Sequence, residues 1–270
     1  MKSFFIIPTF NKEHLIGKVI EGIHLSVSST MPYKMIFIVD GCTDNTETIL
    51  KEYIEFNGIQ DKVDLLYAND IHEIRSLNMG LTHIRDNLDP NDHDLVFTVQ
   101  DDVVLKEKNI DLCFKKLFDR VKNLGYISCR LGCKLHSNGD TIGESDFVES
   151  EFGHWSMMGL NNFKQIKRGQ FSPCEAVIRS PTCVLWHRYR TVGFYNEDLA
   201  PCGFDCHDFS IRMNLAGYNN GVFALSYESD VDWGSTREKP ATEVNSKIGQ
   251  IFERNKKHLA KIYNEYFEKK

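Results

Sequence analysis

Two adjacent carboxylates, Asp101 and Asp102, follow the apolar run 95–99 in this sequence. Neighbouring carboxylates repel each other, and they stay ionised at low cost only where water or a cation neutralises them. Hard divalent cations bind carboxylate oxygens and leave positions open for phosphate oxygens. The pair therefore predicts a Mn²⁺ or Mg²⁺ site that holds the phosphates of a leaving nucleotide. A turn that follows a strand and caps the next helix is the alternative.

Polar residues also follow two earlier apolar runs, with Thr9 and Asn11 after 3–8 and Asp40 after 35–39. Further strands are predicted at 63–67 and 95–99, and apolar residues at helical spacing predict helices between them, over 13–27, from Thr43 or Asp44 onward, over 73–86 and over 107–122. This alternation predicts an α/β fold with a mostly parallel sheet and helices on both faces. Ligands bind beyond the carboxyl ends of such strands, so these polar groups are expected to share one edge.

The second half of the sequence is less regular. Glycines recur through 130–172 and predict loops and short strands, after which 174–186 and 222–226 read as strands and 206–216 as a helix. The tail 244–267 is amphipathic. From Lys247 onward seven lysines and arginines face three glutamates, so the tail carries +4 of a chain whose net charge is −6. A helix docked on the domain is the simple interpretation, and a peripheral membrane contact is the alternative.

The composition excludes some classes of protein. A net charge of −6 does not favour nucleic-acid binding, and no run approaches the roughly 20 apolar residues that span a bilayer. A signal peptide is also absent, so we expect a cytoplasmic protein with reduced cysteines. Two cysteine pairs, Cys129/Cys133 and Cys202/Cys206, have four-residue spacing, and His207 follows the second pair. A zinc site needs considering, but without a Cys-x-x-Cys knuckle small buried residues are the simpler explanation.

Five segments in chain order carry a resemblance to a known family: 6–13 (IIPTFNKE), 38–46 (IVDGCTDNT), Arg75 with Asn78 and Gly80, 100–102 (QDD), and 202–208 (CGFDCHD) followed by Ser210, Arg212 and 217–218 (GY). Together they resemble the family 2 glycosyltransferases of the GT-A fold, over about residues 3–235. The resemblance implies a single domain at 1–240, with a nucleotide-binding half at 1–125, an acceptor-binding half at 126–240, and a C-terminal helix at 241–270.

The resemblance also implies roles for residues of the first half. Thr9 and Asp40 would contact the base or ribose, and a strand-end carboxylate can accept a hydrogen bond from the imide N–H of uracil. Asn11 is also expected to bind the donor. Glu13 would reach the ribose or serve as a cap, and Arg75 would approach the diphosphate or lie exposed on its helix.

Two departures from the family pattern matter. Gln100 stands where the family has the first aspartate of its metal motif, so Asp102 is expected to hold the metal while Asp101 assists donor binding. The acidic motif reads His207-Asp208 instead of Glu-Asp. Asp208 retains the carboxylate and is the predicted catalytic base, with Asp205 as a rival and a helix cap as the alternative role.

Acceptor contacts are assigned to three residues. Trp155, beside His154, and Trp233 offer aromatic faces to a sugar ring, although core packing is the commoner fate of such rings, and His207 lies next to the predicted base. Asp232 or Arg237 would close the diphosphate site.

The leading hypothesis is an inverting glycosyltransferase that moves a sugar, from a UDP-sugar first of all, to a glycan or lipid-linked acceptor in polysaccharide biosynthesis. Gln100 and His207 motivate a non-catalytic nucleotide-sugar-binding protein as the alternative. A nucleotidyltransferase or a dinucleotide oxidoreductase needs glycines after the first strand, and the turn at 9–12 (TFNK) has none.

Overall fold

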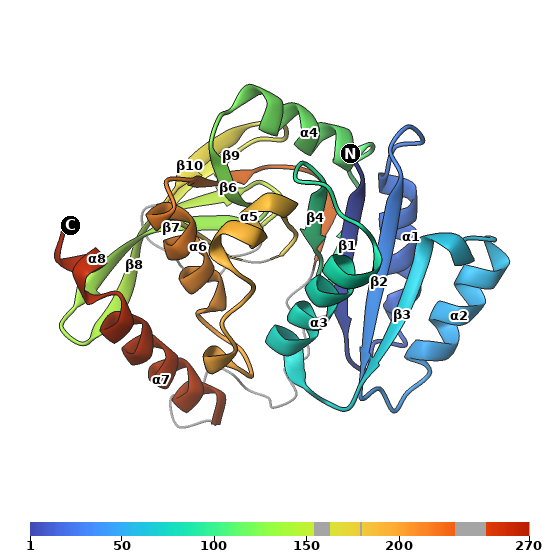
Figure 1. Ribbon diagram of the computed structural model, residues 1–270, viewed down its shortest axis with the longest axis horizontal. Coiled ribbons are helices and arrows are strands. Elements are labelled where there is room, and N and C mark those ends of the chain that lie inside the picture. Colours follow the sequence, from blue (N-terminus) through green and yellow to red (C-terminus); the bar gives the residue numbers. More distant parts are fainter. Residues whose placement is uncertain (154–162, 179, 230–246, 270) are drawn as a thin grey trace.

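The computed structural model describes residues 1–153, 163–178, 180–229 and 247–269 (Figure 1). Its central sheet has eight strands in the order β10-β13-β6-β12-β4-β1-β2-β3. Their bounds are β1 Ser3–Thr9, β2 Tyr33–Asp40, β3 Val63–Ala68, β4 Leu95–Thr98, β6 Leu124–Ser128, β10 Phe171–Cys174, β12 Thr182–Leu185 and β13 Asn219–Phe223. A second sheet has the order β11-β7-β8-β9, with β7 Leu131–Asn138, β8 Thr141–Ser150, β9 Phe163–Ile166 and β11 Ala176–Ile178. A short ribbon pairs β5 Val104–Leu105 with β14 Tyr227–Glu228.

Helices cover both faces of the central sheet, and the alternation within β1 shows how. Phe5 and Ile7 join the core formed with α1 (Ile16–Ser26), α2 (Thr46–Phe56) and α4 (Ile110–Arg120). Phe4 and Ile6 join the core on the other face, with α3 (His72–Asn87), α5 (Trp186–Val192) and α6 (Asp205–Leu215). A strand buried on both faces reads as an unbroken apolar run, which is what residues 3–8 show. The predicted α/β fold is confirmed.

The parallel strands β3, β2, β1 and β4 lie side by side. Strands β2 and β3 extend the sheet on one side of β1, whereas β4 lies on the other side of β1, so the order of the strands switches between β1 and β4. The residues after β1 and after β4 therefore meet in one crevice. The switch places Thr9 and Phe10 next to Asp101 and Asp102, although about ninety residues separate the two segments. The antiparallel strand β12 then continues the sheet on the far side of β4.

The predicted single strand at 174–186 is wrong. It is two strands in different sheets, with β11 paired to β7 and β12 inserted between β4 and β6. Pro181 lies between them, and a proline cannot donate a ladder hydrogen bond, so the run is interrupted there.

The loops and short strands predicted over 130–172 are also partly wrong, because β7 and β8 form a long hairpin. Its glycines Gly132 and Gly143 are strand residues over which the side chains of Cys174 and His136 pack. A glycine in a strand marks such a close approach as readily as a loop.

The C-terminal segment forms α7 (Lys247–Ile262) and α8 (Asn264–Glu268), which lie along the β7–β8 hairpin (Figure 1). Ile248, Leu259 and Phe267 are buried against the domain. Two short 3₁₀ turns, η1 (Gln60–Lys62) and η3 (Glu197–Leu199), complete the described elements. Across the described ranges, no helix has both the length and the apolar character needed to cross a bilayer.

Candidate functional site

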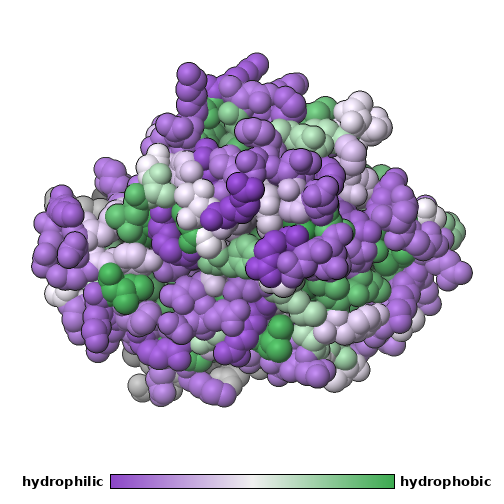
Figure 2. Space-filling view, viewed as in Figure 1, coloured by the Kyte–Doolittle hydropathy of each residue, from purple (hydrophilic) through white to green (hydrophobic). Residues whose placement is uncertain are grey.

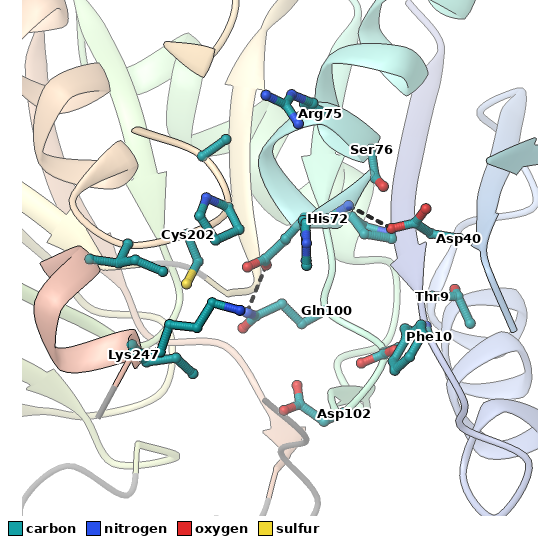
Figure 3. A pocket seen from close by; sticks show the side chains of 17 residues that line it. Thr9, Phe10, Asp40, His72, Arg75, Ser76, Gln100, Asp102, Cys202 and Lys247 are labelled. Carbon is teal, nitrogen blue, oxygen red and sulfur yellow. Dashed lines mark hydrogen bonds between the residues drawn. The ribbon is translucent and has the colours of Figure 1, made fainter. Parts of the chain in front are cut away.

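A cavity of about 570 Å³ opens at the carboxyl ends of the parallel strands. Figure 3 shows Thr9, Phe10 and Asp40 on one side of it and Lys247, from the start of α7, on the other. Its described lining consists of Pro8, Thr9, Phe10, Asp40, His72, Glu73, Arg75, Ser76, Gln100, Asp101, Asp102, Ala200, Pro201, Cys202, Lys247, Ile248 and Ile251. The structure therefore brings together five of the residues predicted from the sequence: Thr9, Asp40, Arg75, Asp101 and Asp102.

Asp101 is tied to the loop after β1. Its Oδ2 accepts a hydrogen bond of 2.9 Å from the backbone N–H of Phe10, and its Oδ1 lies 3.8 Å from Nζ of the buried Lys12. Burial raises the pKa of Asp101 to about 7, and the nearby Asp102 and Glu73 carboxylates act in the same direction, whereas Lys12 opposes them. Asp101 therefore joins the two loops and titrates near neutral pH.

Asp102 has a different environment. Its Oδ1 is buried and has no hydrogen-bond partner among the described residues, yet the side chain lines the cavity. A buried carboxylate oxygen without a partner is costly unless a ligand or cation satisfies it. Carboxylate oxygens such as those of Asp102 are the ligands that Mg²⁺ and Mn²⁺ prefer. The residues present thus fit the metal that the sequence predicts.

Gln100 holds a carboxylate that the sequence analysis did not single out. Its Nε2 donates a hydrogen bond of 2.9 Å to Oε1 of Glu73, in the first turn of α3 (Figure 3). Its backbone N–H donates to Oγ of Ser180 at 2.9 Å. Gln100 therefore positions Glu73 beside the cavity, and a carboxylate is present there although residue 100 itself is neutral.

The described lining of the cavity carries more negative than positive groups. Its four carboxylates face two cationic side chains, those of Arg75 and Lys247. A diphosphate would add further negative charge, and like charges in a partly desolvated site repel each other strongly. A divalent cation bound beside these carboxylates would remove this conflict.

Asp40 fastens α3 to the sheet edge. Its two carboxylate oxygens accept backbone N–H bonds from Ile71 at 2.7 Å and from His72 at 2.8 Å. A carboxylate at a helix N-terminus is favoured by the unsatisfied N–H groups and by the helix dipole. His72 and the preceding Asp70 both have positive φ, of 69° and 58°. This strained turn is held by Asp40, and it places the first turn of α3 against the cavity.

Asn11 and Glu13 join loops and are not part of the described cavity lining. Oδ1 of Asn11 accepts from the backbone N–H of Thr43 at 2.8 Å, and Oε2 of Glu13 accepts from the backbone N–H of Asn45 at 2.9 Å. Thr9 does line the cavity, and its hydroxyl donates to the carbonyl of Ile7 at 3.1 Å. The contacts of Asn11 and Glu13 hold the loop after β1 against the loop after β2, which favours a structural role for both residues.

Arg75 is half exposed at the mouth of the cavity. Its Nε lies 3.6 Å from Oε2 of Glu197, whose side chain is equally exposed. Such an ion pair is weak in water, so the guanidinium can exchange this partner for a phosphate. Nearby Asn78 exchanges two hydrogen bonds with the backbone of Tyr195, and this holds α3 against the segment before η3.

Asp208 and His207 do not line the cavity. Oδ2 of Asp208 accepts bonds of 2.9 and 2.6 Å from the guanidinium of Arg212, and Oδ1 accepts from the hydroxyl of Tyr263 at 2.7 Å. His207 is buried, and its Nε2 contacts Oε1 of Glu144 on β8. The contacts of Asp208 are those of a structural ion pair one helical turn apart. Asp205 begins α6, directly after the cavity-lining segment that ends at Cys202.

Several predicted residues lie outside the described part of the chain. They are His154, Trp155, Asp232, Trp233 and Arg237. Their assignment to the acceptor or the diphosphate stays a prediction.

Glu73 and Lys247 were missed because neither follows a predicted strand. A weak signal existed for Glu73, which lies two positions before Arg75, near the start of a predicted helix. Lys247 lies about 150 residues from Gln100, and no spacing along the chain relates the two.

The mostly parallel central sheet with helices on both faces is that of the GT-A fold. A family model described as "Glycosyl transferase family 2" matches residues 4–189, and the chain belongs to this family. No match was found among curated protein sequences.

Solved structures with the same fold include GalNAc-T7 with UDP, GalNAc and Mn²⁺ (TM-score 0.68, 9% identity, 99% of this chain and 50% of that chain). They also include the mannosyltransferase PcManGT from Pyrobaculum calidifontis with GDP-Man and Mn²⁺ (TM-score 0.53, 13% identity, 83% and 55%). S. aureus TarS is a third (TM-score 0.53, 14% identity, 86% and 37%). This chain therefore spans about half, or less, of the length of these solved chains.

Proposed function

We propose that this protein transfers a sugar from a nucleoside-diphosphate sugar, with UDP-sugars the first candidates, to a hydroxyl group of a glycan or lipid-linked acceptor. One observation carries the proposal. A cavity at the sheet switch point presents the unpartnered Asp102 oxygen within an excess of carboxylates, which suits a diphosphate only together with a divalent cation. Family membership and the Mn²⁺ complexes of two structural neighbours support the same reaction class.

The two sides of the cavity are assigned to the two ends of the donor. Thr9 and the backbone around Asp40 would bind the nucleoside, because they lie at the ends of β1 and β2. Arg75 and Lys247 would bind the diphosphate oxygens. Asp102 would hold Mn²⁺ or Mg²⁺, which when bound neutralises the charge that develops on the leaving diphosphate.

The catalytic base is assigned to the first turn of α6. An inverting transfer is a single displacement, and one carboxylate takes the proton of the acceptor hydroxyl while the diphosphate leaves from the opposite face. Asp208 was the sequence prediction. Both of its oxygens are bonded to Arg212 or Tyr263, so in this arrangement neither is turned toward an acceptor hydroxyl. We propose its rival Asp205 instead, because it begins the same helix and lies nearer along the chain to the cavity-lining Cys202; Asp205 is also buried and outside the described lining.

The first experiment measures UDP binding by calorimetry, with Mn²⁺ and again with EDTA, for the wild type and Asp102→Asn. We expect affinity to fall about 100-fold or more without metal and in the variant, because the diphosphate then meets uncompensated carboxylates. Asp119→Asn, an exposed aspartate on α4 paired with Lys115, is the matched control and should bind normally. UDP binding that ignores both metal and Asp102 would rule out the proposed donor site.

A non-catalytic nucleotide-sugar-binding protein remains the alternative, and turnover separates the two. UDP release from a panel of UDP-sugars, offered with glycan and lipid-linked acceptors, is expected for the enzyme. Metal-dependent binding of UDP-sugar without release in any combination would favour the binding protein.

A further inference from the structure

A second cluster of metal-ligating side chains lies away from the donor cavity. Cys133 on β7, Glu144 on β8 and His207 on α6 each offer one ligand atom, and these atoms all lie within 4.8 Å of one another. Cys133 and His207 are buried, and Glu144 is partly buried. None of the three belongs to the described lining of the donor cavity.

The β7–β8 pairing explains why these residues converge. Leu135 pairs with Glu144, and His136 pairs with Gly143. Directly opposed residues of an antiparallel pair share a face, so Glu144 points with Leu135 toward the buried side and His136 points the other way. His207 reaches the same side from the first turn of α6, where its Nε2 contacts Glu144.

His207 presents its Nε2 to the cluster, where that atom contacts Oε1 of Glu144. The residue is buried, and its Nδ1, on the other side of the ring, has no hydrogen-bond partner among the described residues. A metal bound at Nε2 would fix the tautomer that carries the proton on Nδ1.

The ligand chemistry indicates which ion would fit. Thiolate, imidazole and carboxylate together are typical of zinc, whereas Mg²⁺ and Mn²⁺ prefer oxygen alone. Zinc bonds of about 2.0–2.3 Å hold tetrahedral ligand atoms roughly 3.3–3.8 Å apart. The three ligand atoms lie within 4.8 Å of one another, so zinc binding requires side-chain rotations that bring them to that spacing. The Glu144–His207 contact would then be replaced by two bonds to the metal.

We propose that Cys133, Glu144 and His207 form a zinc site that joins the β7–β8 hairpin to α6. Binding takes the thiolate form of Cys133 and releases its proton. The fourth position is left for water. The site is separate from the donor metal and does not depend on the proposed transferase activity. Its role is structural, because it fastens the first turn of α6, which begins at Asp205, to the second sheet.

The test uses the purified full-length protein stripped of metal and titrated with Co²⁺, a spectroscopic substitute for zinc. We expect one equivalent to give the near-ultraviolet absorption band of a cobalt–thiolate bond, and one equivalent of Zn²⁺ to abolish it. Zinc at a hundredfold excess over its Kd should raise the midpoint of thermal unfolding by about 5–10 °C. Absence of the thiolate band in the folded wild type overturns the proposal.

Variants locate the site. Cys133→Ser should lose the band, and Glu144→Gln should weaken Zn²⁺ affinity at least about tenfold. His136→Gln, on the opposite face of the hairpin, and Asp102→Asn, in the donor cavity, should keep both the band and the affinity. A band that survives in folded Glu144→Gln with unchanged Zn²⁺ affinity, or that disappears in Asp102→Asn, contradicts the assignment.

Discussion

At the scale of single residues, the two aspartates at the start of α6 have different expected roles. Asp208 pairs with Arg212 and Tyr263 and is 1% exposed. Asp208→Asn leaves the guanidinium with a weaker partner, so we expect the free energy of unfolding to fall by about 2–4 kcal/mol, with turnover per folded molecule largely kept. Asp205→Asn should lower kcat about 100-fold or more per folded molecule. Denaturant unfolding and UDP-release kinetics measure the two effects, and the reverse pattern would restore Asp208 as the base.

The pKa of Asp101, raised to about 7, should make the proposed binding of the donor depend on pH. Below about pH 7 this carboxyl holds a proton, and a divalent cation bound beside it must displace that proton. Metal-dependent UDP affinity should therefore fall about tenfold per pH unit below 7 and level off above it. Calorimetry in buffers of different ionisation enthalpy counts the released proton. Asp101→Asn should flatten the profile, and an unchanged slope in that variant would assign the titration to another group.

The raised pKa of Asp101 also affects the folding stability of the metal-free protein, which should fall as the pH rises, whereas UDP affinity should rise. The folded carboxyl binds its proton more tightly than the unfolded one, whose pKa is near 3.8. The stability that this proton contributes is fully present below about pH 4 and is lost as the pH rises through about 7. A bound cation reverses this loss, so metal should stabilise the protein more at pH 8 than at pH 6.

At the scale of elements, the position of α3 depends on one close contact with β1. A Cβ added at Gly80 would lie 2.5 Å from Cγ2 of Ile6, which is fully buried. Gly80→Ala should lower the free energy of unfolding by about 1–3 kcal/mol, because a packed core cannot yield that distance. The control is Gly17→Ala on α1, where the nearest atom, Cγ2 of Ile49, is 3.6 Å away. That change should stabilise by about 0.5–1 kcal/mol, and equal effects at both positions would contradict the argument.

At the scale of the whole molecule, α7 belongs to the donor cavity as one of its walls. Its buried Asn255 donates through Nδ2 to the carbonyls of Leu199, Cys202 and Gly203, at 2.8, 3.0 and 2.9 Å. This segment includes Ala200, Pro201 and Cys202, which line the cavity. The helix thus holds a wall formed about fifty residues earlier in the chain.

Asn255→Ala should therefore affect both stability and donor binding. Loss of these hydrogen bonds should cost about 1–3 kcal/mol in unfolding and weaken UDP affinity several-fold, because the wall at 200–202 loosens. Asn264→Ala, at an exposed residue of α8 that bonds only Glu268 in the described structure, is the control. Unfolding curves and calorimetry test this. A large loss of stability with unchanged UDP affinity would show that the wall takes no part in donor binding.

The surface limits how the protein could meet a membrane. The face seen in Figure 2 is mainly hydrophilic, with its apolar residues in small separate groups. The apolar residues Ile248 and Leu259 of α7 are buried against the domain. Peripheral membrane contact through this helix stays a prediction, and it would rest on lysines and on attraction to anionic lipids, which salt weakens.

The sequence by itself determined the first half of the fold and the place of the cavity at the strand ends. Each parallel strand is an apolar run of a few residues, and in each helix the apolar residues recur with the helical period of about 3.6 residues. Local patterns therefore suffice to identify these elements. The rule that ligands bind beyond strand ends then places Thr9, Asp40 and Asp101–Asp102 at one edge without further information.

Only the tertiary structure decided which side chains are free to act. The bonding of Asp208 to Arg212 and Tyr263, the pairing of Gln100 with Glu73, and the meeting of Cys133, Glu144 and His207 are contacts between segments or faces that no local period encodes. The hairpin β7–β8 and the split of β11 from β12 were missed for the same reason. The pairing of distant segments is set by global packing, and that packing decides whether a carboxylate holds the fold together or meets a substrate.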